Sequence, residues 1–275
     1  MKLIYKKLIR PLLFQLDAEH AHDLACRFLK VTEKSILARK CISLASSAKS
    51  QSCNVFGLSF PNRLGLAAGM DKNGAFPKTF SSLGFGHVEI GTITPKAQPG
   101  NPKPRLFRYP KYNALVNRMG FNNDGADAVV SRIAKFYPKG KRSTPLGINI
   151  GKGKDTPIEQ AHNDYISCLN KCYNQADYIT VNISSPNTPN LRELHGKSVI
   201  TPFLENLIKA SRTCAKKHNI EMVPLLLKIS PDENYKSLEH IVCSARDIGF
   251  SGVIATNTSV SRLKASNLET FEMVD

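Results

Sequence analysis

Six short apolar runs alternate with segments of helical periodicity from residue 64 onward, and this alternation constrains the fold more than any other feature. The apolar runs predict strands at 64–70, 88–94, 146–151, 178–184, 225–230 and 253–257. The segments between them predict helices at 75–83, 124–136, 157–173, 201–218 and 235–248. Near-continuous apolar strands separated by helices are typical of a parallel sheet that is buried on both faces.

Nearly every predicted strand ends in a polar or glycine-bearing run. Because the carboxyl ends of parallel strands meet at one edge, six such ends indicate one shared mouth, as in a (β/α)₈ barrel. The richest run follows the fourth strand, where Asn182, Ser185 and Asn187 offer uncharged donors and acceptors suited to a flat polar heterocycle. Taken alone, the same serines, asparagines and prolines are equally typical of a turn.

The chain of 275 residues carries 38 basic and 22 acidic residues, a net charge of +16. The basic residues are scattered and are not interleaved with aromatic ones, so we do not expect nucleic-acid binding. An anionic small substrate or an anionic membrane surface fits the charge at least as well. The seven cysteines form no C-x-x-C pair, which is typical of a reducing compartment.

The first 50 residues differ in kind from the rest. Leucines recur at helical spacing between residues 3 and 16, with lysines and an arginine between them, and Asp17 could cap a second helix. No apolar run is long enough to span a bilayer, and charges interrupt the segment too often for a secretory signal. Two amphipathic helices could lie in a membrane interface or pack against the main domain, and the pattern leaves both readings open.

Two lysines are singled out by their surroundings. Lys72 follows the first predicted strand, close to Gly69, whose missing side chain permits a ligand to approach the backbone. A solvated surface lysine is the simpler reading of Lys72 alone. Lys228 lies inside an apolar strand between Leu227 and Ile229, where a charge is costly unless it meets a ligand or a carboxylate. We therefore expect Lys228 to face an anion or the edge of a flavin ring.

A long connection after the second strand, 117–123, concentrates amides and a glycine and is a third candidate for the site. Several motifs are missing from the sequence. The sequence contains no G-x-G-x-x-G motif and no Walker loop, so it does not predict tight binding of a dinucleotide or ATP. No G-x-S-x-G motif surrounds Ser185, which argues against an α/β-hydrolase. The sequence also contains neither an H-E-x-x-H motif nor a cluster of carboxylates, so no metal site is expected.

Taken together, the motifs resemble dihydroorotate dehydrogenase in its membrane-associated, quinone-dependent class. The motifs are LGLAAGMDK (64–72), EIGTITP (89–95), NPKPRLFR (101–108), NRMGFNN (117–123), GINIGK (147–152), NISSPNTP (182–189) and IATNT (254–258). The run FQLD at 14–17 resembles the N-terminal quinone-site extension of this class. The resemblance covers essentially the whole chain, in order.

The resemblance implies an FMN enzyme of pyrimidine synthesis that oxidises dihydroorotate to orotate and passes the electrons to a membrane quinone. Ser185 stands where this class keeps the base that removes the C5 proton. The residues implied to bind substrate are Lys72, Asn117, Arg118, Met119, Gly120, Phe121, Asn182, Asn187, Asn257 and Thr258. Those implied to line FMN are Ala68, Gly69, Met70, Asp71, Lys72, Thr92, Asn149, Asn182, Lys228 and Thr256. The quinone would enter between the N-terminal helices, near His22 and Arg108.

The resemblance also implies two domains, a helical membrane and quinone-site extension at 1–50 and an FMN-binding barrel at 51–275. In the family, a seventh and an eighth strand bring the glycine-rich loops that hold the FMN phosphate, and this sequence ends at Asp275 before them. The expected fold is therefore a TIM-type (β/α)₈ barrel that lacks its last two strand–helix units and carries an N-terminal amphipathic helical extension.

Two alternatives remain open. One is an inactive truncated remnant or partner-binding fragment. The other is a different FMN barrel reductase acting on pyrimidines, which predicts a cysteine acid where this chain has Ser185. The expected protein is a monomer bound peripherally to the cytoplasmic side of the inner membrane through its N-terminal helices. Dihydroorotate, orotate and a membrane quinone are its expected small-molecule partners.

Overall fold

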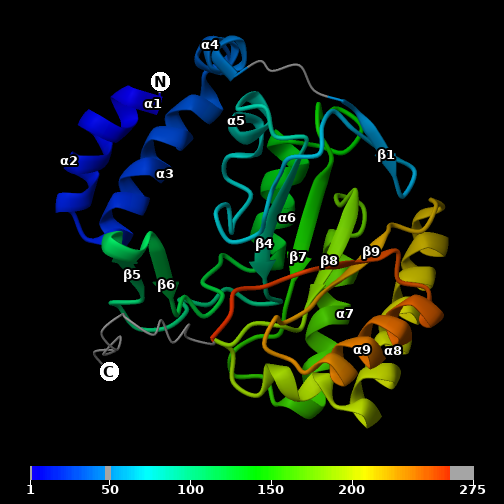
Figure 1. Cartoon of the computed structure of the whole chain (residues 1–275). Helices are drawn as coiled ribbons and strands as arrows, with labels where there is room; N and C mark the ends of the chain where they lie inside the picture. The colour runs from blue at the N-terminus through cyan, green and yellow to red at the C-terminus, as the bar shows by residue number, and fades with distance from the viewer. Residues whose placement is uncertain (1, 47–50, 261–275) are drawn as a thin grey trace.

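A curled sheet of six parallel strands forms the centre of the computed structural model, which describes residues 2–46 and 51–260 (Figure 1). The strands run in the order β10-β9-β8-β7-β4-β3. Their bounds are β3 Gly65–Leu66, β4 His87–Ile93, β7 Leu146–Ile150, β8 Tyr178–Asn182, β9 Leu225–Lys228 and β10 Gly252–Ile254. All six predicted strands are present, and this half-barrel confirms the TIM-type α/β class; β3 and β10 are shorter than predicted.

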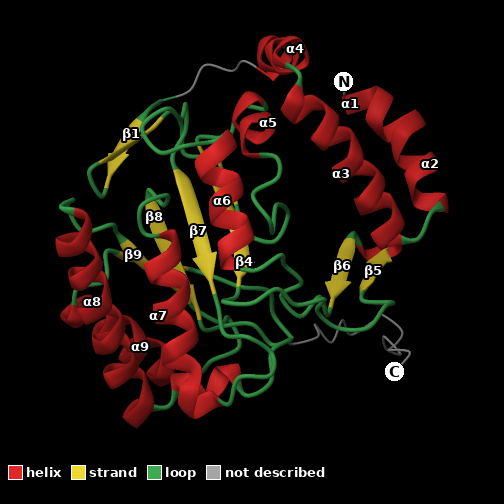
Figure 2. Ribbon diagram, turned by 180° about the vertical axis from the view of Figure 1, so that it is seen from behind, coloured by secondary structure: helices red, strands yellow, loops and turns green. Residues whose placement is uncertain are grey.

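Five helices connect these strands, as predicted, and four of them, α6 to α9, cover the outer face of the sheet (Figure 2). Their bounds are α5 Pro77–Ser82, α6 Ala126–Phe136, α7 Ala161–Cys172, α8 Lys197–His218 and α9 Tyr235–Ile248. Helix α6 shows why they dock: Ala126, Val129 and Ile133 recur at helical spacing and are all fully buried. Helix α9 ends at Gly249, whose φ of 106° favours glycine.

The sheet is buried on both faces, which explains why its strands are continuously apolar. Every residue of β7 and of β8 is buried. In the parallel register, Ile148 pairs with Ile90 on one side and with Ile179 on the other, and all three side chains are fully buried. One face meets the outer helices and the other forms the interior of the half-barrel.

Two antiparallel hairpins were not predicted from the sequence. The first joins β1 (Cys53–Val55) to β2 (Leu58–Phe60) through Phe56 and Gly57, both at positive φ. Two central residues at positive φ make the turn that suits a two-residue hairpin. The second joins β5 (Leu106–Tyr109) to β6 (Ala114–Asn117) through the 3₁₀ turn η2, Pro110–Tyr112. Two further 3₁₀ turns are η3 (Ile158–Gln160) and η4 (Leu191–His195).

The N-terminal segment forms a layer of helices beside the sheet, next to the β5–β6 hairpin (Figure 1). Its elements are α1 Lys2–Ile4, the π-helix η1 Tyr5–Ile9, α2 Arg10–Gln15, α3 Ala18–Lys34 and α4 Ile36–Ser46. Asp17 caps α3 as expected, because its carboxylate accepts the N–H groups of Glu19 and His20 at 2.8 and 3.2 Å. Helix α4 was not predicted. Within residues 2–46 and 51–260, every helix is too short or too polar to cross a bilayer.

Several polar contacts attach these helices to the rest of the molecule, and three of them show how. The buried pair Arg105–Glu19 has an N–O distance of 2.9 Å. Glu33 accepts the backbone N–H of Thr79 at 2.8 Å and so caps the first turn of α5. Arg108 donates to the carbonyl oxygen of Leu13 at 3.1 Å. The helices therefore do pack on the main part of the chain. The predicted domain boundary at residue 50 lies outside the described residues and stays a prediction.

Candidate active site

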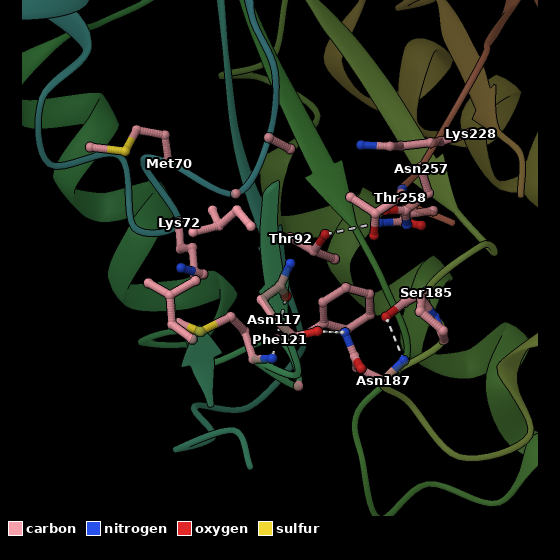
Figure 3. Close-up of a pocket in the computed structure, with 18 of the residues that line it drawn as sticks. Met70, Lys72, Thr92, Asn117, Phe121, Ser185, Asn187, Lys228, Asn257 and Thr258 are labelled. Atoms are coloured by element: carbon pink, nitrogen blue, oxygen red, sulfur yellow. Dashed lines mark hydrogen bonds between the residues drawn. The ribbon is translucent and has the colours of Figure 1, made fainter. Parts of the chain in front are cut away.

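A cavity of about 330 Å³ opens among the polar runs at the carboxyl ends of the strands. Figure 3 shows Met70 and Lys72 on one side of it and Ser185, Lys228 and Asn257 on the other. The cavity is lined by His22, Ala68, Gly69, Met70, Lys72, Thr92, Leu106, Leu115, Asn117, Met119, Gly120, Phe121, Asn182, Ser185, Pro186, Asn187, Lys228, Asn257 and Thr258. Parallel packing thus brings residues from the carboxyl ends of five of the six strands, β3, β4, β8, β9 and β10, to one mouth, while the end of β7 does not line it.

Most of the predicted site residues line this cavity. Sequence reasoning missed three of the residues that do: Leu106 and Leu115, which come from the unpredicted β5–β6 hairpin, and Pro186. Pro186 lies inside the NISSPNTP motif between two predicted site residues, so its position in the run was the available signal. Leu106 lies in the NPKPRLFR motif and pairs with the predicted site residue Asn117, but no local pattern showed that the hairpin lies beside the cavity, because that depends on tertiary packing.

Two residues predicted to line FMN lie behind the cavity wall instead. Asp71 is 1% exposed and accepts the backbone N–H groups of Ala75 and Phe76, each at 2.8 Å. Burial raises the pKa of Asp71 to about 6, although those two N–H groups act in the opposite direction. Asn149 is fully buried and reaches the site only through Thr92, whose hydroxyl donates to Asn149 Oδ1 at 2.6 Å.

Three other predicted residues also lie outside the cavity lining. Arg118 donates to the carbonyl oxygen of Pro104 at 3.3 Å, and its guanidinium lies over the ring of Phe107. Thr256 is exposed, and its hydroxyl donates to the backbone of Asn257 at 2.9 Å. Arg108 binds backbone carbonyls of the N-terminal helices, so it holds the extension in place and does not reach the cavity.

Two lysines give the cavity its positive charge. Lys228 is only 7% exposed and lines the cavity, and neither it nor Lys72 has a hydrogen-bond or ion-pair partner within residues 2–46 and 51–260. Burial, together with the nearby charge of Arg105, lowers the pKa of Lys72 below its ordinary value. A buried ammonium is costly without a counter-charge, so the donor set fits a ligand that carries negative charge.

A chain of side-chain hydrogen bonds fixes the amides on the other side. Asn182 Nδ2 donates to the hydroxyl of Thr92 at 3.1 Å, and the hydroxyl of Ser184 donates to Asn182 Oδ1 at 2.9 Å. Asn257 Nδ2 in turn donates to the Ser184 hydroxyl at 3.1 Å, and its Oδ1 accepts the N–H of Thr258 at 2.8 Å. Each of these amide nitrogens keeps a second proton, and these protons suit ligand carbonyl oxygens.

Ser185 lies at the start of the loop that follows β8. The residue is 4% exposed, and its Oγ accepts the backbone N–H of Asn187 at 3.2 Å. Asn187 in turn donates to the carbonyl oxygen of Asn117 at 3.4 Å, which joins the loop to the β6 segment. The hydroxyl is thus held in place, shielded from bulk water, and receives one N–H donor.

The remaining walls fit a flat ring. Gly69 has a φ of 115°, and a methyl group placed on it would meet no atom within 4 Å, so open space lies directly beside the backbone. Ala68, Met70 and Phe121 add apolar surface on the same cavity. A flat heterocycle with carbonyl groups and negative charge therefore matches the donors and the shape of this site. FMN has these properties.

Comparison with known proteins decides the family. The family model described as dihydroorotate dehydrogenase matches residues 50–275. The dihydroorotate dehydrogenase (quinone) of Janthinobacterium sp. (strain Marseille) is 47% identical over 270 residues, which are 98% of this chain and 76% of that protein. The chain belongs to the quinone-dependent dihydroorotate dehydrogenase family. The enzyme of the same name from Acinetobacter baumannii (strain ATCC 17978) is also 47% identical, over 95% of this chain and 75% of that protein.

Solved structures of the family agree with the fold. The Eimeria tenella DHODH in complex with ferulenol has a TM-score of 0.76 at 34% identity, covering 90% of this chain and 68% of that one. The ligand-free enzyme from the same organism has a TM-score of 0.70 and covers 85% and 72%. Dihydroorotate dehydrogenases are FMN flavoproteins, so membership confirms the predicted oxidoreductase class and cofactor.

Proposed function

We propose that this chain oxidises dihydroorotate to orotate in pyrimidine synthesis, with FMN as the hydride acceptor and a quinone as the final acceptor. The observation that carries the proposal is the composition of one cavity. A shielded serine, two lysines without a counter-ion in the described part of the chain, and oriented amides converge there, and His22 of the N-terminal helices lines the same space. Each part has a distinct task in this reaction.

Ser185 is proposed as the base that removes the C5 proton of dihydroorotate. A serine hydroxyl is a weak base in water, so it must give up its own proton as it takes the C5 proton, and the alkoxide form needs a hydrogen-bond donor and shielding from solvent. The backbone N–H of Asn187, 3.2 Å from Oγ, supplies such a donor, and the residue is almost fully buried. A fixed donor costs no reorganisation during the reaction.

The substrate is proposed to bind between Lys72 and the amides. Lys72 meets the carboxylate, because a half-buried ammonium without a counter-ion stabilises an anion strongly. The free N–H groups of Asn182 and Asn257 donate to the pyrimidine carbonyl oxygens. Asn117, Asn187 and the segment Met119–Phe121 complete the lining on the side of the β5–β6 hairpin.

FMN, when bound, supplies the two-electron acceptor and relays the electrons onward to quinone. Ala68, Gly69, Met70 and Thr92 are proposed to line its ring, with Asn182 at the edge shared with the substrate. Lys228 places its positive charge in the same cavity and stabilises negative charge there. Asp71 and Asn149 support this wall from behind rather than touching the ligand.

The quinone is proposed to approach from the N-terminal helices. His22, on α3, lines the cavity, and burial together with the charge of Lys72 lowers its pKa, so the imidazole is neutral at pH 7. A neutral imidazole suits an uncharged quinone better than an imidazolium does. Arg108 fixes the α2–α3 connection through the carbonyl oxygens of Leu13 and Leu16.

Membrane attachment is proposed to occur through the same helices. Large apolar side chains point to solvent along them, among them Leu8 at 62%, Leu12 at 65% and Phe28 at 66% exposure. Lys6 and Lys7 lie in the same stretch and suit an anionic lipid surface. The two relatives at 47% identity are bacterial, which favours the cytoplasmic side of the inner membrane. The monomeric state stays a prediction.

An anaerobic titration tests the proposal. The 275-residue chain loaded with FMN is mixed with dihydroorotate, and the visible flavin absorbance is followed. Bleaching is expected, and addition of a soluble quinone is expected to restore the colour. Flavin that stays oxidised in the presence of excess dihydroorotate would contradict the proposed reaction.

A further inference from the structure

His195 makes an unusual pair of contacts beside the Ser185 loop. It ends the 3₁₀ turn η4 and is only 5% exposed. Its Nδ1 lies 2.7 Å from Glu233 Oε1, at the start of α9, and its Nε2 lies 3.0 Å from the carbonyl oxygen of Ile183. One ring therefore connects two loops that flank the cavity.

Both contacts of the ring are with groups that can only accept. The carbonyl oxygen of Ile183 has no proton, and the ionised carboxylate of Glu233 has none. A ring nitrogen that carries a proton therefore donates to one of these two oxygens. The second oxygen of Glu233 accepts from the hydroxyl of Ser237 at 3.3 Å, which fixes the carboxylate beside the ring. Hydrogen bonds to an ionised carboxylate are among the strong ones.

The position of this ring matters because Ile183 directly precedes the reactive segment. The carbonyl of Ile183 is two residues before Ser185, so the contact from His195 closes the intervening chain, 183–195, into a ring. Leu191 and Leu194, within that segment, are buried. A second contact, the ion pair between Arg192 and Asp232 at 2.9 Å, joins the same two loops but does not involve the backbone beside Ser185.

We propose that His195 is a positioning residue whose ring, held by Glu233, fixes the backbone that carries Ser185. The role of Ser185 rests on the proposed function; the fixing of the loop does not. Catalysis by a positioned group is sensitive to small displacements, and a shift of about 1 Å can lower a rate about 100-fold. Loss of the ring contact should therefore slow proton removal more than it weakens substrate binding.

Three variants of the 275-residue chain test this. His195→Leu removes both donors, and His195→Gln keeps one amide donor for the Ile183 carbonyl. Arg192→Met is the matched control, because it removes the ion pair with Asp232 that joins the same two loops and leaves the Ile183 contact intact. The measurements are proton NMR of the low-field imidazole resonances, hydrogen exchange of residues 184–194, and kcat and KM for dihydroorotate.

The wild type is expected to show a low-field N–H resonance that both His195 variants lack. In His195→Leu, the backbone amide hydrogens of residues 184–194 are expected to exchange faster than in the wild type. Its kcat should fall at least about tenfold, while its KM for dihydroorotate stays within about twofold of the wild-type value. His195→Gln should recover most of that loss, and Arg192→Met should resemble the wild type. Equal losses in His195→Leu and Arg192→Met would overturn the proposal, and so would unchanged exchange in His195→Leu.

The two proposals fail separately. If dihydroorotate leaves the wild-type flavin oxidised, the proposed function fails, and the exchange comparison still decides the role of His195. If His195→Leu does not fold, Glu233→Leu replaces it. That variant removes the acceptor of Nδ1 and should speed exchange in the same segment, and unchanged exchange would again overturn the proposal.

Discussion

The half-barrel and the N-terminal helices place their large apolar side chains in opposite environments. In the sheet, Ile90, Ile148 and Ile179 have no exposed surface. In the N-terminal helices, Leu12 is 65% exposed, Phe28 66% and Leu44 81%. Both regions are helical or strand-like with regular periodicity, so the difference lies in what covers the apolar side chains and not in their local structure.

This contrast indicates that the two regions are built for different surroundings. The half-barrel hides its apolar residues from water and concentrates polar groups at one mouth. The N-terminal helices leave a face uncovered that a lipid surface can cover. The cavity lies where the two meet, since His22 comes from one region and Ser185 from the other. The predictions below separate the contributions of the two regions.

The largest effect is expected from Ser185→Ala, which removes the proposed base from the half-barrel. The rate of flavin reduction by dihydroorotate should fall by about 10²–10⁴-fold, because a positioned base contributes about that much. FMN binding should be unchanged. Stopped-flow absorbance measures the rate, and Thr213→Ala, which removes an exposed hydroxyl bonded to the Lys209 carbonyl oxygen within α8, is the control and should react like the wild type. A rate for Ser185→Ala close to that of the wild type would remove this serine from the mechanism.

Matched truncations in the two regions are expected to differ in stability. Ile148→Ala should lower the free energy of unfolding by about 2–5 kcal/mol, because it leaves a cavity in a fully buried core. Leu12→Ala should change it by less than about 0.5 kcal/mol, since the side chain is largely exposed. Denaturant titration of both variants measures the difference. Equal effects would mean that the N-terminal helices bury their leucines after all.

The contact between the regions should depend on Glu19. Glu19→Gln removes the partner of the buried Arg105 and should destabilise the attachment by about 1–3 kcal/mol. Lys103→Gln is the control, because Lys103 is 56% exposed and its pair with Glu19 is worth about 0–1 kcal/mol. Limited proteolysis between residues 2 and 46 reports detachment. Equal protection in both variants would show that apolar packing alone holds the helices.

The same contact should also respond to pH. Burial raises the pKa of Glu19, but the hydrogen bonds from Arg105 and Lys103 outweigh it, so the net pKa lies below the ordinary value of 4.5. A carboxyl group with a lowered pKa in the folded state stabilises that state above its ordinary pKa and loses the effect as pH falls through the folded value. Proteolytic protection should therefore persist at pH 7 and decline as the pH falls below 4.5 and through the lowered pKa.

The smallest effect is expected at the membrane. Substituting Leu8→Ser and Leu12→Ser together should lower binding to anionic vesicles by about tenfold, because each side chain contributes part of its transfer free energy. Vesicle sedimentation measures the loss. Val199→Ser, on the outer helix α8 and 43% exposed, is the control and should bind like the wild type. Unchanged binding of the double variant would mean that another surface meets the lipid.

The contrast between the regions also explains what the sequence could predict. Strand positions followed from continuous apolar runs such as 146–150, and the Asp17 cap followed from a local side chain. The β5–β6 hairpin and the residues it adds to the cavity depend on tertiary packing, which local patterns do not report. His195 was missed for the same reason, because its partner Glu233 lies 38 residues away in the chain.

Within the site, the sequence motifs predicted which segments lie near the cavity better than they predicted which side chains line it. Asp71 and Asn149 stand inside motifs whose other members line the cavity, yet both turn away and bind backbone or neighbouring side chains. In a strand, successive side chains point to opposite faces, and in a loop the direction is set by hydrogen bonds. A sequence motif alone does not show in which direction each of its side chains points.

The most direct test of the different roles of the half-barrel and the N-terminal helices measures flavin reduction and flavin reoxidation in one variant. The chain carrying Leu8→Ser and Leu12→Ser is loaded with FMN and mixed with anionic vesicles that contain a quinone. Flavin reduction by dihydroorotate should stay within about twofold of the wild type, while reoxidation by the vesicle quinone should fall by about tenfold. Parallel loss of both rates, or no change in reoxidation, would contradict the account.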